Sequence, residues 1–157
     1  MLTLQQLKKR LSYNQVTGIF TRNSTGKETG SKKSRYVQIS VKNKQYYAHR
    51  LAWMYIYGSF PSLNIDHING NKRDNRLSNL REATISENAQ NRGKQVNNTS
   101  GYKGVYWAKK SKKWEASIRK NNKTIHLGLY ATPQEAYEVY KKAAKVIHTH
   151  NSEALNV

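Results

Sequence analysis

Hydrophobic residues recur at helical spacing in three stretches of the chain. The first covers residues 3–12, where leucines repeat every three or four positions behind a threonine that can cap a helix. The second covers residues 48–57 and stops at Gly58. The third follows residue 132, has Pro133 at its first helical position and carries an apolar face to Ile147. The pattern predicts a short N-terminal helix, a central helix and a C-terminal helix.

Alternation of apolar and polar residues predicts two groups of short strands. In the first half, residues 19–21 and a hairpin over 36–47 have this alternation, with its turn at Asn43. The intervening loop, residues 23–34, is basic and has no core residue, so we expect it to be mobile without DNA and to contact phosphates, with an idle linker as the alternative. In the second half, three strands joined by tight turns are expected at residues 104–107, 113–119 and 123–127.

Between these two groups, the stretch from Asp66 to Arg92 combines strand, loop and helix signals. Residues 63–66 and 80–83 are apolar enough for two short strands around an Asn/Gly/Asp-rich loop at 69–75. Thr84 followed by Glu87 fits a capping box, and Gly93 fits a helix stop. This arrangement can bring the side chains of the first strand and of the following helix to one place.

The polar residues of this stretch fit phosphodiester hydrolysis. Such a reaction needs a base that deprotonates water, and His67 can be that base. It also uses a divalent ion, and Asp66 with the side-chain carbonyl of Asn88 would suffice for a hard cation that keeps most of its water. Asn79 can hydrogen-bond the loop backbone with both ends of its amide and so orient His67. The alternative is a structural loop in which Asn and Asp only serve the bends.

These residues resemble the HNH (ββα-metal) nucleases, most closely the phage and intron-homing branch. The resemblance implies that Asp66 and Asn88 hold one divalent metal, that His67 is the general base and that Asn79 braces the loop. Asn88 stands where other branches carry His, which favours Mg²⁺ or Mn²⁺ over zinc. The segment from His49 to Trp53 also resembles the part that precedes the motif in phage members. His49 and Arg50 are therefore possible site residues, although a His at a helix start is more often structural.

Charge and composition extend this interpretation. The chain has 28 Lys and Arg against 9 Asp and Glu, a formal charge of +19 that predicts a polyanionic partner. The excess is spread over both halves, with +12 in residues 1–97 and +7 in residues 98–157. The absence of Cys excludes disulfides and zinc-thiolate sites. No stretch resembles a membrane span or a signal peptide, so we expect an intracellular protein. The resemblance to phage members implies that it is encoded by a phage and acts in the host cytoplasm.

The C-terminal segment, with Tyr102-Lys103-Gly104-Val105 and Trp114-Glu115-Ala116-Ser117-Ile118-Arg119, resembles the Apetala-type (ethylene-response-factor) DNA-binding domain. That resemblance implies a three-stranded sheet that lies in the major groove and is backed by one helix, with Trp114 and Arg119 on DNA. Plant members commonly have Arg, Arg and Trp where this chain has Tyr106, Thr124 and His126, so their target sequence does not transfer. The cationic and aromatic groups of the segment give the expected contact set. It comprises Tyr106, Lys113, Trp114, Arg119 and Lys123. The alternative for Trp114 is a core position.

Together these patterns predict an α+β fold with three parts. An HNH domain with a β-rich N-terminal extension covers residues 1–92, a linker covers 93–100 and an Apetala-type domain covers 101–157. The predicted function is a metal-dependent, homing-type endonuclease that acts on double-stranded DNA with one Mg²⁺ or Mn²⁺ and no small-molecule cofactor. We expect a monomer, with a dimer as the alternative. A DNA-binding regulator without catalysis and an RNA-binding protein are the competing functions.

Overall fold

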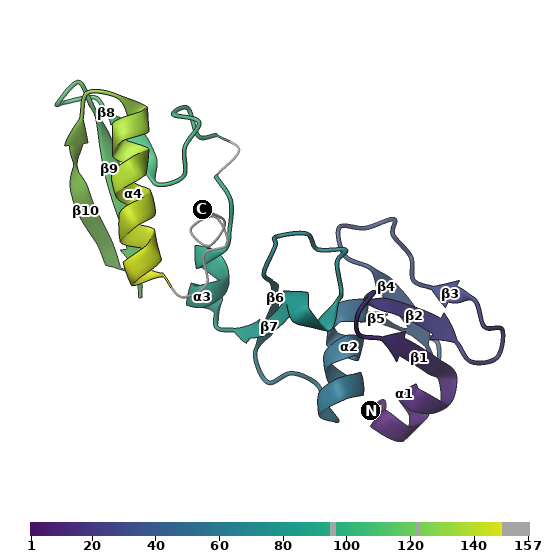
Figure 1. Cartoon of the computed structure of the whole chain (residues 1–157). Helices are drawn as coiled ribbons and strands as arrows, with labels where there is room; N and C mark the ends of the chain where they lie inside the picture. Colours follow the sequence, from purple (N-terminus) through teal and green to yellow (C-terminus); the bar gives the residue numbers. More distant parts are fainter. Residues whose placement is uncertain (95–96, 122, 149–157) are drawn as a thin grey trace. The chain divides into compact units, whose positions relative to one another are not determined.

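The computed structural model has the predicted α+β fold and describes residues 1–94, 97–121 and 123–148 (Figure 1). The chain divides into two compact units, one up to Ala83 and one from Thr84 onward. This division precedes the predicted helix after Thr84, whereas the sequence predicts the boundary at residues 93–100. Within the described residues, every helix is too short or too polar to cross a bilayer.

The first unit packs two helices and a 3-10 turn with three small antiparallel sheets (Figure 1). The helices are α1 (Leu4–Arg10) and α2 (Ala48–Tyr57), and the 3-10 turn is η1 (Leu77–Asn79). The first sheet has the order β1 (Leu11–Asn14), β2 (Ile19–Arg22) and β3 (Glu28–Thr29). The other two are the hairpins of β4 (Gln38–Val41) with β5 (Lys44–Tyr47) and of β6 (Asn64–His67) with β7 (Leu80–Ala83).

One apolar core joins these elements. Leu7 of α1, Phe20 of β2, Ile39 of β4 and Leu51 of α2 are all at most 2% exposed and belong to the same cluster. Helix α2 has the predicted bounds because its apolar face packs on this core and Gly58 adopts the left-handed conformation (φ 87°) that ends it. The same cluster includes Ile65 of β6 and Leu80 of β7, so one core joins α2 to this hairpin.

Two parts of the first unit differ from the sequence prediction. The first helix ends at Arg10 rather than residue 12, because the buried Leu11 begins strand β1. The loop at 23–34 is anchored: β3 pairs with β2, and Ser31 pairs with Gln38 through backbone hydrogen bonds in both directions. The polar side chains of this loop do not indicate which backbone groups will pair, so the sequence alone predicts a mobile loop.

The second unit begins with α3 (Ile85–Gln90) and continues into a sheet of order β10 (Lys123–Tyr130), β9 (Lys113–Lys120) and β8 (Val105–Ala108). Helix α4 (Pro133–Ile147) covers one face of this sheet (Figure 1). Capping boxes start both helices, at Thr84 with Glu87 and at Thr132 with Glu135, as predicted. Helix α3 ends at Gln90, before the expected stop at Gly93.

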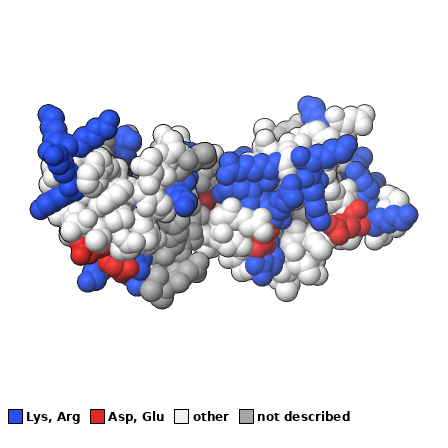
Figure 2. Space-filling model, turned by 90° about the horizontal axis from the view of Figure 1, so that it is seen from above, with Lys and Arg blue, Asp and Glu red and all other residues white. Residues whose placement is uncertain are grey.

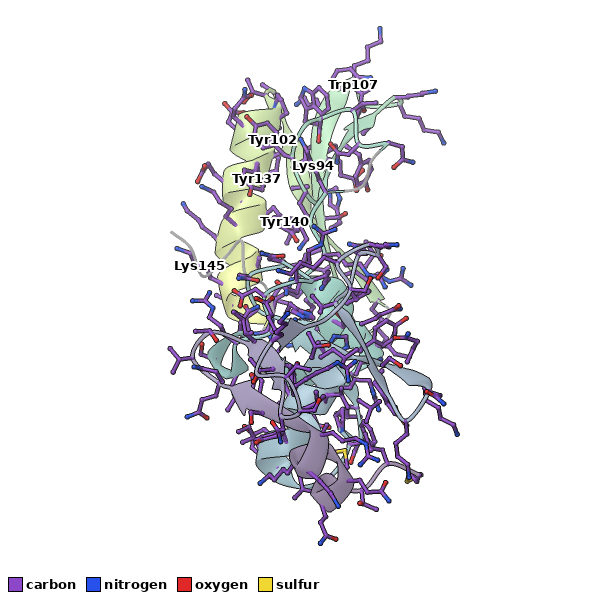
Figure 3. The ribbon with its side chains drawn as sticks, turned by 90° about the vertical axis from the view of Figure 1, so that its right-hand side faces the viewer. Lys94, Tyr102, Trp107, Tyr137, Tyr140 and Lys145 are labelled. Atoms are coloured by element: carbon purple, nitrogen blue, oxygen red, sulfur yellow. The ribbon has the colours of Figure 1, made fainter. Side chains whose placement is uncertain are left out.

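The interface between α4 and the sheet is rich in tyrosine. Tyr137 lies 4.8 Å from Tyr102 and 6.2 Å from Tyr140 between ring centroids, and Figure 3 shows the three rings along α4. Gly104 adopts a φ of 73°, and a Cβ there would come within 2.2 Å of the Tyr140 ring. Only glycine fits both requirements at this position.

Part of the predicted linker is bound to the second unit. The Asn98 side chain donates to the carbonyl of Tyr102 (2.8 Å), and the Ser100 hydroxyl lies 2.7 Å from the carbonyl oxygen of Val105. These contacts hold residues 98–100 against the start of β8. Residues 95 and 96, in the middle of the predicted linker, lie outside the described residues.

Candidate active site and nucleic-acid interface

Asp66 and His67 end strand β6, and both side chains are fully buried. The antiparallel register with β7 places Arg81 opposite Asp66 and Leu80 opposite His67. Successive residues of a strand point to opposite faces, so the carboxylate and the imidazole leave β6 in different directions. The strand thus supplies an acid and a base from one short segment of backbone.

Asn79 holds the loop that follows His67. Its side-chain oxygen accepts the backbone N–H of Asn69 (2.9 Å), and its side-chain nitrogen donates to the carbonyl of Asp74 (2.8 Å). Its own carbonyl accepts the N–H of Ile68 (2.9 Å). Asn79 is only 5% exposed, so these three bonds hold both sides of the loop in a site that excludes most water.

His67 is held in its neutral form. Burial lowers the pKa of its imidazole, and the nearby Lys72 acts in the same direction, while the hydrogen bond with Asn75 opposes them. Nε2 of His67 lies 3.4 Å from Oδ1 of Asn75, a buried side chain that the sequence assigns only to the loop. In the sequence, the only feature that could have indicated Asn75 as a site residue is its position in a run of Asn and Asp. A neutral imidazole can accept a proton from water at neutral pH.

Two cations contact the buried Asp66 carboxylate. Nε and Nη2 of Arg81 donate to Oδ2 at 3.1 and 2.9 Å. Nζ of Lys72 lies 3.8 Å from Oδ1. Neither residue was predicted from the sequence, because Arg81 meets Asp66 only through the pairing of β6 with β7.

His49 lies against His67 in a cluster of rings. The two imidazoles meet edge to face with centroids 5.1 Å apart, and the Tyr47 ring stacks on His49 at 5.4 Å. Tyr36 lies 5.4 Å from His49 and 6.1 Å from His67. Burial, then the charges around it, lower the pKa of His49 to about 3. His49 is thus a neutral neighbour of the candidate base.

Two arginines brace segments that precede the motif in the chain. Arg50 donates to the carbonyl of Pro61 (3.4 Å) and lies over the Phe60 ring, contacts that secure the turn after α2. Arg73 donates to the carbonyl oxygens of Lys32 (2.9 Å) and Ser34 (3.4 Å). The basic 23–34 loop is therefore tied to the loop that follows His67.

The second expected metal ligand, Asn88, is half-buried on α3 and belongs to the second unit. The described residues contain no group of three or more His, Cys, Asp and Glu side chains arranged to hold a metal ion. The Asp66 carboxylate and the side-chain carbonyl of Asn88 are oxygen donors, the ligand type that hard divalent cations take.

The sheet of the second unit has an apolar face and a polar face. Ala116 and Ile118 of β9 are buried in the clusters that include residues of α4. Glu115 and Arg119 alternate with them and so occupy the opposite, open face. Lys113 and Ser117 of β9 share this open face through the same alternation. Cross-strand pairing adds Tyr106, Thr124 and His126.

The expected DNA contacts divide between these faces. Tyr106, Lys113 and Arg119 lie on the open face and are exposed. Trp114 lies on the helix-facing side, packs against the Val105, Ala116 and Ala136 cluster and meets Trp107 edge to face at 5.1 Å. Lys123 pairs with Lys120 at an exposed end of the sheet, in the helix-facing row. Trp114 is thus partly buried against this cluster and does not lie on the open face, which favours the alternative over a DNA contact.

An acidic group sits in the middle of the open face. Oε1 of Glu115 lies 2.6 Å from Nδ1 of His126. The hydrogen bond with Tyr106 lowers the pKa of Glu115, and the bond with His126 adds to this effect. Glu115 was not predicted as a site residue, because only cationic and aromatic groups were expected on this face.

The first unit carries a basic pocket outside the candidate active site. It has a volume of about 260 Å³ and lies where the end of α1 meets β2 and the turn between β4 and β5. Arg22 donates to the carbonyl of Ser40 (3.2 Å), which fixes one of its cations. Basic side chains form a broad band over the visible face of this unit (Figure 2). The lining is Lys9, Arg10, Leu11, Arg22, Ser24, Val41 and Lys42.

Comparison with known proteins accounts for both halves of the chain. A family model of HNH endonucleases matches residues 46–90, and a model of the AP2 domain matches residues 100–150. Protein 3.8 of Escherichia phage T7 is 36% identical over 85 residues, which cover 51% of this chain and 70% of that protein. The chain belongs to the HNH endonuclease family. The HNH segment contains the motif from Asp66 to Asn88, and the AP2 domain follows it, as the two resemblances in the sequence implied.

Two further relatives cover parts of the chain. An ethylene-responsive transcription factor-like protein of Arabidopsis thaliana is 40% identical over 57 residues, 35% of this chain but only 24% of that protein. A solved structure described as DNA binding and cleavage by the HNH homing endonuclease I-HmuI is 26% identical, with a TM-score of 0.46, and covers 57% of this chain and 55% of that one. The HNH chain thus spans about a quarter of the first protein and about half of the second.

Proposed function

We propose that this protein is a metal-dependent DNA endonuclease that hydrolyses phosphodiester bonds in double-stranded DNA. The observation that supports it best is the buried His67 beside Asp66 at the end of β6, with a lowered pKa and followed by a loop that Asn79 holds from both sides. The formal charge of +19 suits a DNA partner.

In this proposal His67 takes the proton from the water that attacks phosphorus, and the bond from phosphorus to the leaving oxygen breaks. Asn79 is a positioning residue, because its hydrogen bonds hold the loop and not the substrate. Asp66 and Asn88 would hold one Mg²⁺ or Mn²⁺. When bound, the ion would neutralise charge on the phosphate and on the leaving oxygen.

The AP2 domain supplies affinity and site choice in this proposal. Its open face combines an exposed guanidinium, Arg119, with Lys113 and Tyr106. Such groups can contact phosphates and base edges in a major groove. Target choice in the major groove then depends on the open face and not on Trp114, which is partly buried on the helix-facing side.

A cleavage assay tests the proposal. Supercoiled plasmid and phage genomic DNA are incubated with the full chain, with Mg²⁺ or with a chelator. We expect metal-dependent nicked or linear products from the wild-type protein and none from His67→Ala.

The second candidate function is a DNA-binding regulator without catalysis. The two cations on Asp66 favour it, because they occupy the carboxylate that a metal would need. This regulator would bind DNA equally well with a chelator and cut none of it under any metal condition. Metal-dependent cleavage that requires His67 would exclude it.

A further inference from the structure

The charge around Asp66 raises a problem for metal binding. The carboxylate is fully buried, Arg81 donates twice to one of its oxygens, and Lys72 lies 3.8 Å from the other. Two positive groups thus face one negative group in a site of low dielectric. A divalent cation that approached Asp66 would meet a carboxylate already paired and two like charges within a few ångströms.

The cations can change partner more easily than the carboxylate can. The Arg81 side chain is 19% exposed and that of Lys72 is 18% exposed, while the Asp66 side chain is 0% exposed. Each cation therefore contacts the buried Asp66 while part of its side chain is open to solvent. Guanidinium and ammonium groups bind phosphate oxygens strongly, and a guanidinium can do so with two parallel hydrogen bonds.

We propose that Arg81 and Lys72 act as exchangeable partners of Asp66 that couple metal binding to DNA binding. In the free protein they neutralise the buried carboxylate and oppose the divalent ion. When a DNA phosphate arrives, they move toward it, and Asp66 becomes available to the metal. This inference rests on the proposed function, and it makes metal and DNA bind with positive cooperativity.

The coupling has a thermodynamic signature. If DNA raises the affinity for the metal by some factor, the metal must raise the affinity for DNA by the same factor. Replacing Arg81 with a neutral residue removes a competitor of the metal. The replacement should therefore raise the metal affinity of the free protein. It should also reduce the factor by which DNA raises that affinity.

The experiment measures both ligands on the full chain at pH 8. Mn²⁺ binding to the free protein is followed by the electron paramagnetic resonance signal of unbound Mn²⁺. Duplex binding is followed by fluorescence anisotropy with Mn²⁺ and with chelator, in a His67→Ala background that is expected to leave the duplex intact. We expect Mn²⁺ to tighten duplex binding about tenfold in that background. We expect Arg81→Gln to tighten Mn²⁺ binding by the free protein about tenfold. The same change should remove most of the increase in duplex affinity that Mn²⁺ produces.

Arg76→Gln is the matched control. Arg76 lies in the same segment and also pairs with an aspartate, Asp74, but on the surface and not at Asp66. It should leave Mn²⁺ affinity and the coupling factor within twofold of the parent. Asp66→Asn should weaken Mn²⁺ binding in every background, which identifies the site that the signal reports.

Arg81→Gln leaves a buried carboxylate with one partner fewer, so its folding is checked by circular dichroism. If it does not fold, Lys72→Gln carries the test, with a smaller change in the same direction, because Lys72 is the more distant cation. Unchanged Mn²⁺ affinity in a folded Arg81→Gln protein, or in Lys72→Gln in its place, would overturn the coupling. If the wild-type protein still nicks plasmid, the proposed function survives that result. Absence of both metal binding and nicking in the wild-type protein would overturn the function itself.

Discussion

The imidazole of His49, at the start of α2, meets the imidazole of His67 edge to face, with ring centroids 5.1 Å apart. Only 7% of His49 is exposed, and burial with the nearby charges lowers its pKa to about 3. The two rings can pack together while both are neutral. Protonation of both would place two positive charges in contact. The stability of the first unit should therefore depend on pH.

The sign follows from the lowered pKa. As pH falls below about 6.5, unfolded chains protonate His49 while the native protein keeps it neutral until about pH 3. The free energy of unfolding should therefore decrease toward acid by about 1.4 kcal/mol per pH unit for this residue. Denaturant titrations between pH 7 and pH 4 measure the slope, and His49→Phe should reduce it. An equal slope in that variant would contradict the assignment.

His67→Ala should abolish metal-dependent cleavage and keep duplex affinity within a few-fold. The change deletes the proposed base but none of the lysines and arginines that contact phosphates. Cleavage is measured on supercoiled plasmid and affinity by anisotropy at one salt concentration. Retained cutting would remove His67 from the mechanism, and lost binding would show that it has a structural role as well.

Asn79→Ala should slow cleavage and destabilise the first unit. The change leaves the N–H of Asn69 and the carbonyl of Asp74 without the side chain that pairs them, at a cost of about 1–3 kcal/mol. Asn71→Ala is the control, because Asn71 is exposed and its side chain makes only a local bond to the N–H of Arg73. Thermal unfolding and plasmid nicking report the two effects. Equal behaviour of both variants would show that Asn79 does not brace the site.

Arg119→Ala and Trp114→Ala should have different effects. Arg119 is on the open face, so its loss should weaken duplex binding by about 1–3 kcal/mol and relax sequence choice if it reads a guanine. Trp114 is partly buried against the cluster between the sheet and α4, so its loss should cost up to about 3 kcal/mol of stability. Anisotropy with several duplexes and thermal unfolding separate the two outcomes. A Trp114→Ala protein of normal stability and poor affinity would reverse this assignment.

The basic pocket of the first unit should add to DNA affinity. Replacing Lys9 and Lys42, two of its cations, with Gln should weaken duplex binding and make the logarithmic salt dependence shallower, by about one unit for each phosphate that the variant no longer neutralises. Lys141→Gln is the control, because Lys141 is paired with Glu138 on α4. An unchanged salt slope in the double variant would place DNA away from this pocket.

Local features of the chain were predictable because they depend on residues close in sequence. The bounds of α2, the strand Leu80–Ala83 and the capping box at Thr84 follow from helical or alternating periodicity and from a side chain that bonds three residues ahead. Polar segments were harder, because the pairing of β3 with β2 uses backbone atoms that leave no pattern in the side chains.

By itself, the sequence determined the Asp66-His67 motif, the order of the two domains and the basic charge, since residue type and spacing along the chain are enough for each. Only the tertiary structure decided what surrounds the motif. Strand register places Arg81 against Asp66, and packing places His49 against His67. The position of α4 makes Trp114 pack on the covered side of the sheet and leaves Arg119 exposed on the other side. Such contacts join segments far apart in the chain, so they are set by pairing and burial rather than by any local pattern.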